Sequence, residues 1–182
     1  MTPLATVSDF QSVIQTEQQY AIRLIQPQDN AAVRDIITYV LREEFGFRDT
    51  CYAWADPETQ AMYEAYRHPE SRYFVVEDTE TGEVLGGGGF SRLKRTRLED
   101  GICELQKLYF LPKTRGLGLG KAMLTHCLEQ ARQLGYQKMY LESTTKMMPA
   151  ITLYRRYGFE HVDKPLGDTG HFACDVHMLR DL

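Results

Sequence analysis

The stretch from Leu105 to Leu134 constrains the fold most, because it reads as a strand, a tight turn and a helix in direct succession. Residues 105–111 are mostly apolar or aromatic, and Pro112 ends the run, as expected for a strand that enters a turn. From Leu119 onward, apolar residues recur at helical spacing. A helix with glycine in its first turn exposes unpaired N–H groups and the positive end of its dipole. The turn glycines, Gly116, Gly118 and Gly120, therefore indicate an anion site suited to phosphate.

Two common phosphate-binding motifs do not fit this turn. A dinucleotide-binding fingerprint counted from Gly116 requires glycine at the position of Lys121. A P-loop ending in Gly120-Lys121 requires glycine in place of Arg115 and Ser or Thr in place of Ala122. A nucleotide-binding module is therefore disfavoured.

The pattern that fits is Arg-x-x-Gly-x-Gly, preceded by Leu-x-Phe-x-Pro over residues 108–112. This stretch resembles the acetyl-CoA signature of the GCN5-related N-acetyltransferase (GNAT) superfamily. The resemblance implies acetyl-CoA as cosubstrate, with the loop amides on its pyrophosphate and the preceding strand paired with the pantetheine arm. The cofactor-binding residues implied by the motif are Leu108, Tyr109, Phe110, Arg115, Gly116, Leu117, Gly118, Leu119, Gly120 and Lys121.

Composition sets broader limits. The chain has 182 residues, which suits one domain, and its formal net charge of −4 argues against a dedicated nucleic-acid binder. No apolar run reaches membrane-spanning length. The four cysteines are widely spaced and predict neither a disulfide framework nor a zinc site, which fits a cytoplasmic location. We expect an N-terminal arm over residues 1–19 and a single domain over residues 20–182.

The order of predicted elements is βααβββαβαββ. A strand, a crossover helix and a strand predict a parallel pair between residues 105–111 and 137–143. The resemblance implies an α/β (α+β) GNAT fold, with a mostly antiparallel mixed sheet, helices on both faces and this central pair splayed to hold acetyl-CoA. The remaining elements are expected at 20–26, after Pro27, at 57–67, 72–78, 83–91, 149–157, 159–162 and 172–179.

Two further segments are unusual. The four glycines at 86–89 weaken a strand and indicate a bulge or the close approach of another group. No helix follows them, so they are not a phosphate loop. The basic cluster between Arg92 and Arg97 is interpreted as a solvated turn, with attraction of an acidic acceptor as the alternative.

Glu104 is the first candidate for the catalytic base, since it resembles the acidic residue on the corresponding strand of the family. A carboxylate in a partly apolar cleft gains a raised pKa and can accept a proton near neutral pH. The competing interpretation is an ion pair with Lys107. Glu142, His171 and His177 are alternative bases.

Tyr154 is the candidate general acid, because Ala150 to Phe159 resembles the family's C-terminal helix motif, where a tyrosine protonates the departing sulfur. A core role is the alternative, and Tyr157 could fill it. The chain departs from many family members at Met147, where they carry an asparagine that helps to hold pantetheine. Ser143 or Thr144 could supply the missing contact.

Together these residues predict an N-acetyltransferase that moves the acetyl group of acetyl-CoA to a primary amine by direct attack in a ternary complex. The alternative is a non-catalytic acyl-CoA-binding regulatory module on the same fold. A small amine, an amino acid, an antibiotic and a protein N-terminus all stay open as acceptors. We expect a monomer or homodimer without a metal, a nucleic-acid partner or a membrane partner.

Overall fold

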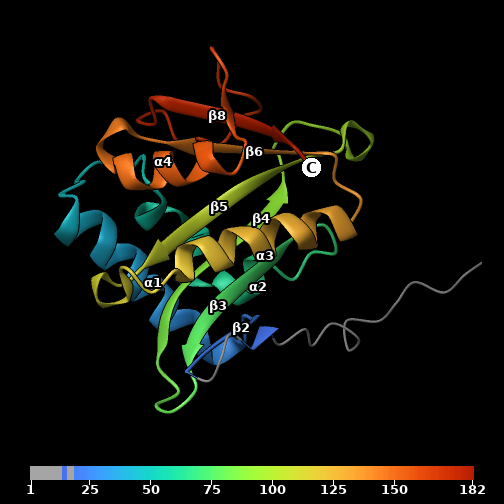
Figure 1. Ribbon diagram of the computed structural model, residues 1–182. Coiled ribbons are helices and arrows are strands. Elements are labelled where there is room, and N and C mark those ends of the chain that lie inside the picture. The colour runs from blue at the N-terminus through green and yellow to red at the C-terminus, as the bar shows by residue number, and fades with distance from the viewer. Residues whose placement is uncertain (1–13, 16–18) are drawn as a thin grey trace, which may run out of the picture.

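The computed structural model describes residues 14–15 and 19–182 (Figure 1). Residues 1–13 and 16–18 lie outside the described residues, and with them most of the arm expected over residues 1–19. The one described piece of that arm that forms an element is β1, a two-residue strand. Among the described segments, no helix combines the length and the apolar character that crossing a membrane requires.

The described strands form one sheet in the order β1-β2-β3-β4-β5-β6-β8-β7. Every neighbouring pair is antiparallel except β5 and β6, which are parallel and are joined through helix α3. This mixed sheet confirms the predicted fold class and the order of elements from β2 onward. The strands are β1 Ile14–Gln15, β2 Tyr20–Leu24, β3 Arg72–Asp78, β4 Val84–Arg92, β5 Ile102–Phe110, β6 Lys138–Ser143, β7 Glu160–His161 and β8 Val176–Asp181.

Helices cover both faces of the sheet (Figure 1). On one face lie α1 (Asn30–Thr38), a π-helical turn that continues it (Tyr39–Glu44), and α2 (Met62–Ala65). On the other face lie α3 (Leu119–Gln133) and α4 (Met148–Arg156).

Strand β3 shows how the two cores are built from one segment. Its Phe74 and Val76 pack into the core beneath α3 and α4, whereas Tyr73 and Val75 pack into the core beneath α1 and α2. Successive side chains of a strand point to opposite faces, so a strand covered on both sides is apolar at nearly every position.

The four glycines of β4 lie where neighbouring groups approach closely, as expected. A Cβ atom on Gly88 would stand 2.4 Å from Leu108 Cδ1, and one on Gly89 would stand 2.3 Å from the Arg72 carbonyl oxygen. The β4–β5 register also shifts between Gly87 and Gly89. Both proposed reasons for the glycines, a bulge and close packing, are confirmed.

The last strand begins at Val176, so the prediction that it starts at Phe172 is wrong. Phe172 is 88% exposed and lies in the loop between β7 and β8. Gly170 turns the chain at φ 85°, and Asp175 accepts hydrogen bonds of 2.8 Å from both the backbone N–H and the hydroxyl of Thr145. The apolar character of this segment therefore does not lead to pairing in the sheet.

The helix expected over residues 57–67 is split. A 3₁₀ turn at Pro57–Gln60 precedes α2, and Ala61 between them leaves helical geometry with φ −144° and ψ 61°.

His126 on α3 is buried against Phe74, whose ring it meets edge-on with centroids 4.4 Å apart. Within the described part of the chain neither ring nitrogen has a hydrogen-bond partner. Burial lowers the pKa of this imidazole below its ordinary value, with Glu129 opposing the shift more weakly. The folded state therefore holds His126 neutral.

In the unfolded chain His126 binds a proton near pH 6.5, whereas burial disfavours that proton in the folded protein. The contribution of His126 therefore lowers the free energy of unfolding as the pH falls below about 6.5. We expect His126→Phe to remove this dependence and to raise stability at pH 5 by about 1 kcal/mol. Urea denaturation at pH 5 and pH 8 measures the effect, with His68→Phe as an exposed control. Equal pH dependence in His126→Phe and the wild type would contradict it.

Candidate active site

The parallel pair separates early. Strands β5 and β6 are in register over three residue pairs, from Ile102–Lys138 to Glu104–Tyr140, although β5 continues to Phe110 and β6 to Ser143. The splayed geometry expected from the sequence is thus present.

A bulge in β5 begins just beyond this point. Lys107 adopts a left-handed conformation at φ 51°, and its carbonyl oxygen accepts a 2.9 Å hydrogen bond from the hydroxyl of Tyr73. A side chain with Cβ is strained in this region, so the surrounding contacts must hold the bulge in place. The bulge directs β5 away from β6.

A cavity of about 70 Å³ lies between the two separated strands. It brings together residues from β5, β6 and α4 that the sequence placed at the cofactor site or beside it. The residues from the sequence analysis that line this cavity are Leu108, Tyr109, Glu142, Ser143, Thr144, Met147 and Tyr154. Phe110 does not line this cavity and packs instead into the core under α3 and α4.

The glycine-rich turn follows β5 through a short 3₁₀ segment, Pro112–Thr114. Gly116 and Gly118 adopt φ 79° and 75°, and Gly118 is the residue that precedes the first turn of α3. Here a left-handed conformation is required, which glycine adopts without strain. Residues 115–118 are exposed, whereas Leu119 is buried.

Arg115 of the turn forms an ion pair with Glu44 at the end of the π-helical turn. Its guanidinium stays largely exposed. The turn therefore presents a cation beside the start of α3, where the helix dipole also favours an anion.

Glu104 is 3% exposed and lies on β5 at the last residue pair shared with β6. Its Oε2 accepts a 2.7 Å hydrogen bond from the side-chain amide of Gln106. Burial raises the pKa of this carboxyl to about 7, the Gln106 bond lowers it, and the charge of Glu142 raises it further. Glu104 is poised to exchange a proton near neutral pH.

The ion pair between Lys107 and Glu104, which was the competing interpretation of Glu104, does not form. The Lys107 ammonium lies 2.8 Å from Asp56 Oδ2 and 3.6 Å from Glu58 Oε2. Its side chain is buried, and these two carboxylates are its ion-pair partners.

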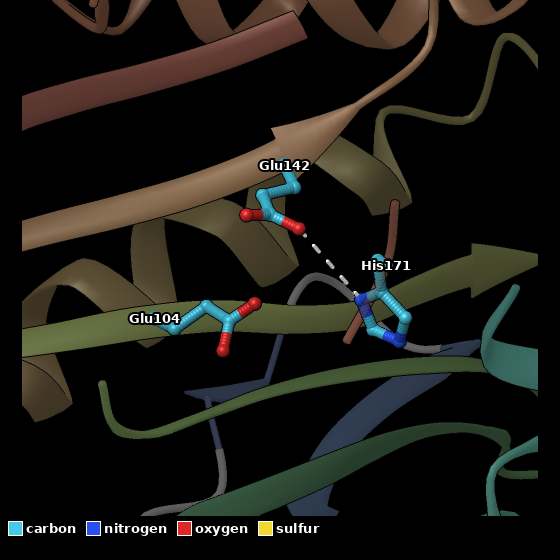
Figure 2. A group of neighbouring side chains, drawn as sticks. All are labelled: Glu104, Glu142 and His171. Carbon is cyan, nitrogen blue, oxygen red and sulfur yellow. Dashed lines mark ion pairs between the residues drawn. The ribbon is translucent and has the colours of Figure 1, made fainter. Parts of the chain in front are cut away.

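Two of the alternative bases lie near Glu104. Glu142 on β6 and His171 in the loop before β8 face it across the space between the strands (Figure 2). The ring of His171 is 3.3 Å from Asp56 Oδ2. His177 on β8 lines a neighbouring cavity with Glu142 and His171.

Tyr154 on α4 is 7% exposed and meets Phe159 edge-on. Burial raises the pKa of its phenol above the ordinary value, with a smaller contribution from Cys127. The phenol therefore stays protonated at neutral pH and can act as a proton donor. Tyr157 packs at the edge of the same core, and Thr125 donates a 3.3 Å hydrogen bond to its hydroxyl.

The basic cluster has local carboxylate partners, which supports its interpretation as a solvated turn. Charge balance of this kind leaves little attraction for an acidic acceptor. The pairs are Arg92 with Glu70, Lys94 with Glu58, Arg95 with Asp168, and Arg97 with Glu99 and Asp100.

A larger open cavity, of about 940 Å³, lies between α1 and the turn that joins β3 to β4. Arg23 lines it and is held in ion pairs with Asp29 and Glu77. None of the predicted site residues lines this cavity, so its size does not make it the site.

The chain belongs to the acetyltransferase (GNAT) family, whose family model matches residues 35–159. Among curated proteins it is 46% identical to an uncharacterized N-acetyltransferase of Escherichia coli (strain K12), YjgM, over 91% of this chain and 96% of that one.

Solved structures share the fold. A GNAT-family acetyltransferase from Staphylococcus aureus Mu50 superposes with a TM-score of 0.78 at 17% identity, over 90% of this chain and 99% of that one. A phosphinothricin acetyltransferase from Sinorhizobium meliloti, solved in complex with AcCoA, gives a TM-score of 0.70 at 22% identity, over 91% and 89% of the two chains.

Proposed function

We propose that the chain transfers the acetyl group of acetyl-CoA to a primary amine by direct attack in a ternary complex. The observation that carries this proposal is the buried Glu104 carboxyl, whose pKa of about 7 suits a base, at the point where β5 and β6 separate. The cavity lined by Glu104 shares Tyr109 and Glu142 with the cavity lined by Tyr154. The proposed base and the proposed acid therefore line two adjoining cavities.

The residues of the chain fit the cosubstrate. A Cβ atom on Gly120 would meet nothing within 4 Å, so the start of α3 is open to an incoming phosphate. Arg115 and the N-terminal end of the α3 dipole supply positive potential there. The separated backbone of Leu108 to Phe110 offers groups that could pair with an extended pantetheine arm. Acetyl-CoA itself supplies the reactive thioester.

In the proposed reaction a C–N bond forms to the acetyl carbon and the C–S bond breaks. Glu104 accepts the proton that the amine loses, directly or through water, and Tyr154 donates its proton to the departing sulfur. A backbone N–H of the β5 bulge region is the proposed donor to the developing oxyanion.

A panel of primary amines tests the function by monitoring release of the free thiol of CoA. We expect at least one small amine, amino acid, antibiotic or peptide to give turnover that depends on both substrates. CoA binding in calorimetry without thiol release for any acceptor would favour the non-catalytic acyl-CoA-binding module.

Tyr154→Phe is expected to lower kcat by about 10²-fold, the lower end for a positioned acid, because a thiolate is already a fair leaving group. The ring still packs against Phe159, so acetyl-CoA affinity should stay within a few-fold. Steady-state kinetics and calorimetry measure the two quantities.

An acyl donor with a more acidic thiol is the control for Tyr154→Phe, because such a leaving group needs less protonation. The defect should shrink with this donor. A defect of equal size with both donors would remove the acid role, and normal kcat with lower stability would make Tyr154 a core residue.

A further inference from the structure

Three side chains from separate segments converge beside the split in the sheet. Glu104 comes from β5, Glu142 from β6 and His171 from the loop before β8, and their polar ends point into a common space (Figure 2). One oxygen or nitrogen atom of each lies within 4.8 Å of the other two. Glu142 Oε2 and His171 Nδ1 are 4.0 Å apart. The three residues line a cavity of about 50 Å³.

Hydrogen bonds from neighbouring side chains orient the two carboxylates. Gln106 donates a 2.7 Å hydrogen bond to Glu104 Oε2. The hydroxyls of Tyr140 and Thr169 donate to the two oxygens of Glu142 at 2.8 and 2.6 Å. These bonds fix the carboxylates in orientation and leave lone pairs for a further donor.

The imidazole of His171 is oriented by Asp56, which faces Nε2 at 3.3 Å. An N–H at Nε2 leaves Nδ1 directed toward Glu142. Burial alone would lower the pKa of this ring, but Asp56, with a smaller contribution from Glu104, raises it, against the nearby charge of Lys107. Glu142 faces the ring as well. The carboxylates of Asp56 and Glu104 thus favour the protonated form of His171, and an entering cation would displace the proton from Nδ1.

We infer that Glu104, Glu142 and His171 form a cradle for the primary ammonium group of the acceptor. This inference rests on the proposed function and names how its acceptor is recognised. Because the three atoms lie within 4.8 Å of one another, a point between them lies at most about 2.8 Å from each, close to the length of an N–H···O or N–H···N hydrogen bond. A primary ammonium has three N–H donors for these three acceptors.

Tetrahedral zinc fits this spacing less well. Zinc binds nitrogen and oxygen at about 2.1 Å, which places tetrahedral ligand atoms about 3.4 Å apart. The Glu142–His171 separation of 4.0 Å is wider than that.

The cradle has a consequence for the reaction. The acceptor binds as R–NH₃⁺, and transfer of one proton to the Glu104 carboxylate leaves R–NH₂ and a carboxylic acid. The nitrogen lone pair is then free to attack, while Glu142 and His171 accept hydrogen bonds from the two remaining N–H groups. After attack the nitrogen loses one of these two protons, and this proton replaces the one that Tyr154 gives to the departing sulfur. Primary amines are therefore favoured over amines that have lost N–H donors to methylation.

The test is a binding titration that needs no turnover. The C–H signals of the His171 ring, assigned with His171→Gln, are followed by NMR as n-butylammonium is added, and tetramethylammonium serves as a probe of equal charge without N–H donors. We expect n-butylammonium to bind at least about 10-fold more tightly, because each lost charged hydrogen bond costs affinity. Its binding should also lower the apparent pKa of His171.

Glu142→Gln should weaken n-butylammonium binding about 10-fold or more. Glu58→Gln is the matched control, since it removes an equal charge nearby but pairs with Lys107 and Lys94 outside the cradle. Equal binding of the two probes, or equal effects of the two variants, would reduce the cradle to diffuse acidic attraction. Displacement of n-butylammonium by micromolar Zn²⁺ would make it a metal site and overturn the inference. Selective binding without acetyl transfer would instead refute the proposed function alone.

Discussion

Replacing Glu104 by glutamine is expected to lower kcat/KM about 10³-fold, within the range found for positioned general bases. The carboxylate is the basic form, so the wild-type rate should rise as the pH increases through about 7, the pKa that burial gives Glu104. Glutamine cannot accept the proton, and this limb of the profile should be lost. The pH dependence of kcat/KM, measured from pH 5 to 9, checks both expectations.

Glu99→Gln is a suitable control for Glu104→Gln, because Glu99 is exposed and pairs with Arg97 in a distant turn. It should retain the wild-type rate and profile. If Glu104→Gln also did so, the base would be Glu142, His171 or an amine that arrives already neutral. Circular dichroism and a denaturation curve exclude loss of the fold as the cause of a slow variant.

Gly120→Asp is expected to weaken CoA binding at least about 10²-fold. Gly120 lies in the first turn of α3, and a Cβ there would meet nothing within 4 Å, so the substitution introduces no clash. A carboxylate at a helix N-terminus interacts favourably with the dipole, which keeps the helix stable. The same carboxylate would occupy the space proposed for the phosphates and would repel them. Calorimetry with CoA measures the loss.

Gly120→Ala separates the charge from the added atom. Alanine is the better helix former and should leave CoA affinity within a few-fold of the wild type. The equivalent change at Gly118 would be less informative, because φ 75° strains any residue with a Cβ. A folded Gly120→Asp protein with unchanged CoA affinity would remove the turn from the cofactor site.

Local motifs made much of this fold predictable. The strand, turn and helix between residues 105 and 134 are determined by neighbouring residues, and each appears where the spacing places it. The resemblance also located Tyr154 and Ser143, and the structure brings both to the same cavity. Loop conformation was less accessible, as the premature start assigned to the last strand at Phe172 shows.

The partners of the charged residues could not be inferred from spacing. Asp56 and His171 are separated by 115 positions, and their contact depends on two loops that meet only in the folded protein. An ion pair of Lys107 with Glu104 was the alternative to the base role, but Lys107, in the left-handed bulge, pairs with Asp56. The periodic spacing of apolar residues along a chain does not show which charged residues pair with each other in the folded protein.

Because β5 and β6 pair over only three residues, the sheet divides into two parts along the seam between these strands. Strands β1 to β5 and strands β6, β8 and β7 meet along this seam only at its narrow end. Fluctuations that open the seam should require less free energy than unfolding either half. A ligand arm lying between the strands would stitch them together, so amide hydrogens of β6 from Leu141 to Ser143 should exchange much more slowly once CoA is bound. The cofactor would then stabilise the sheet as well as take part in the reaction.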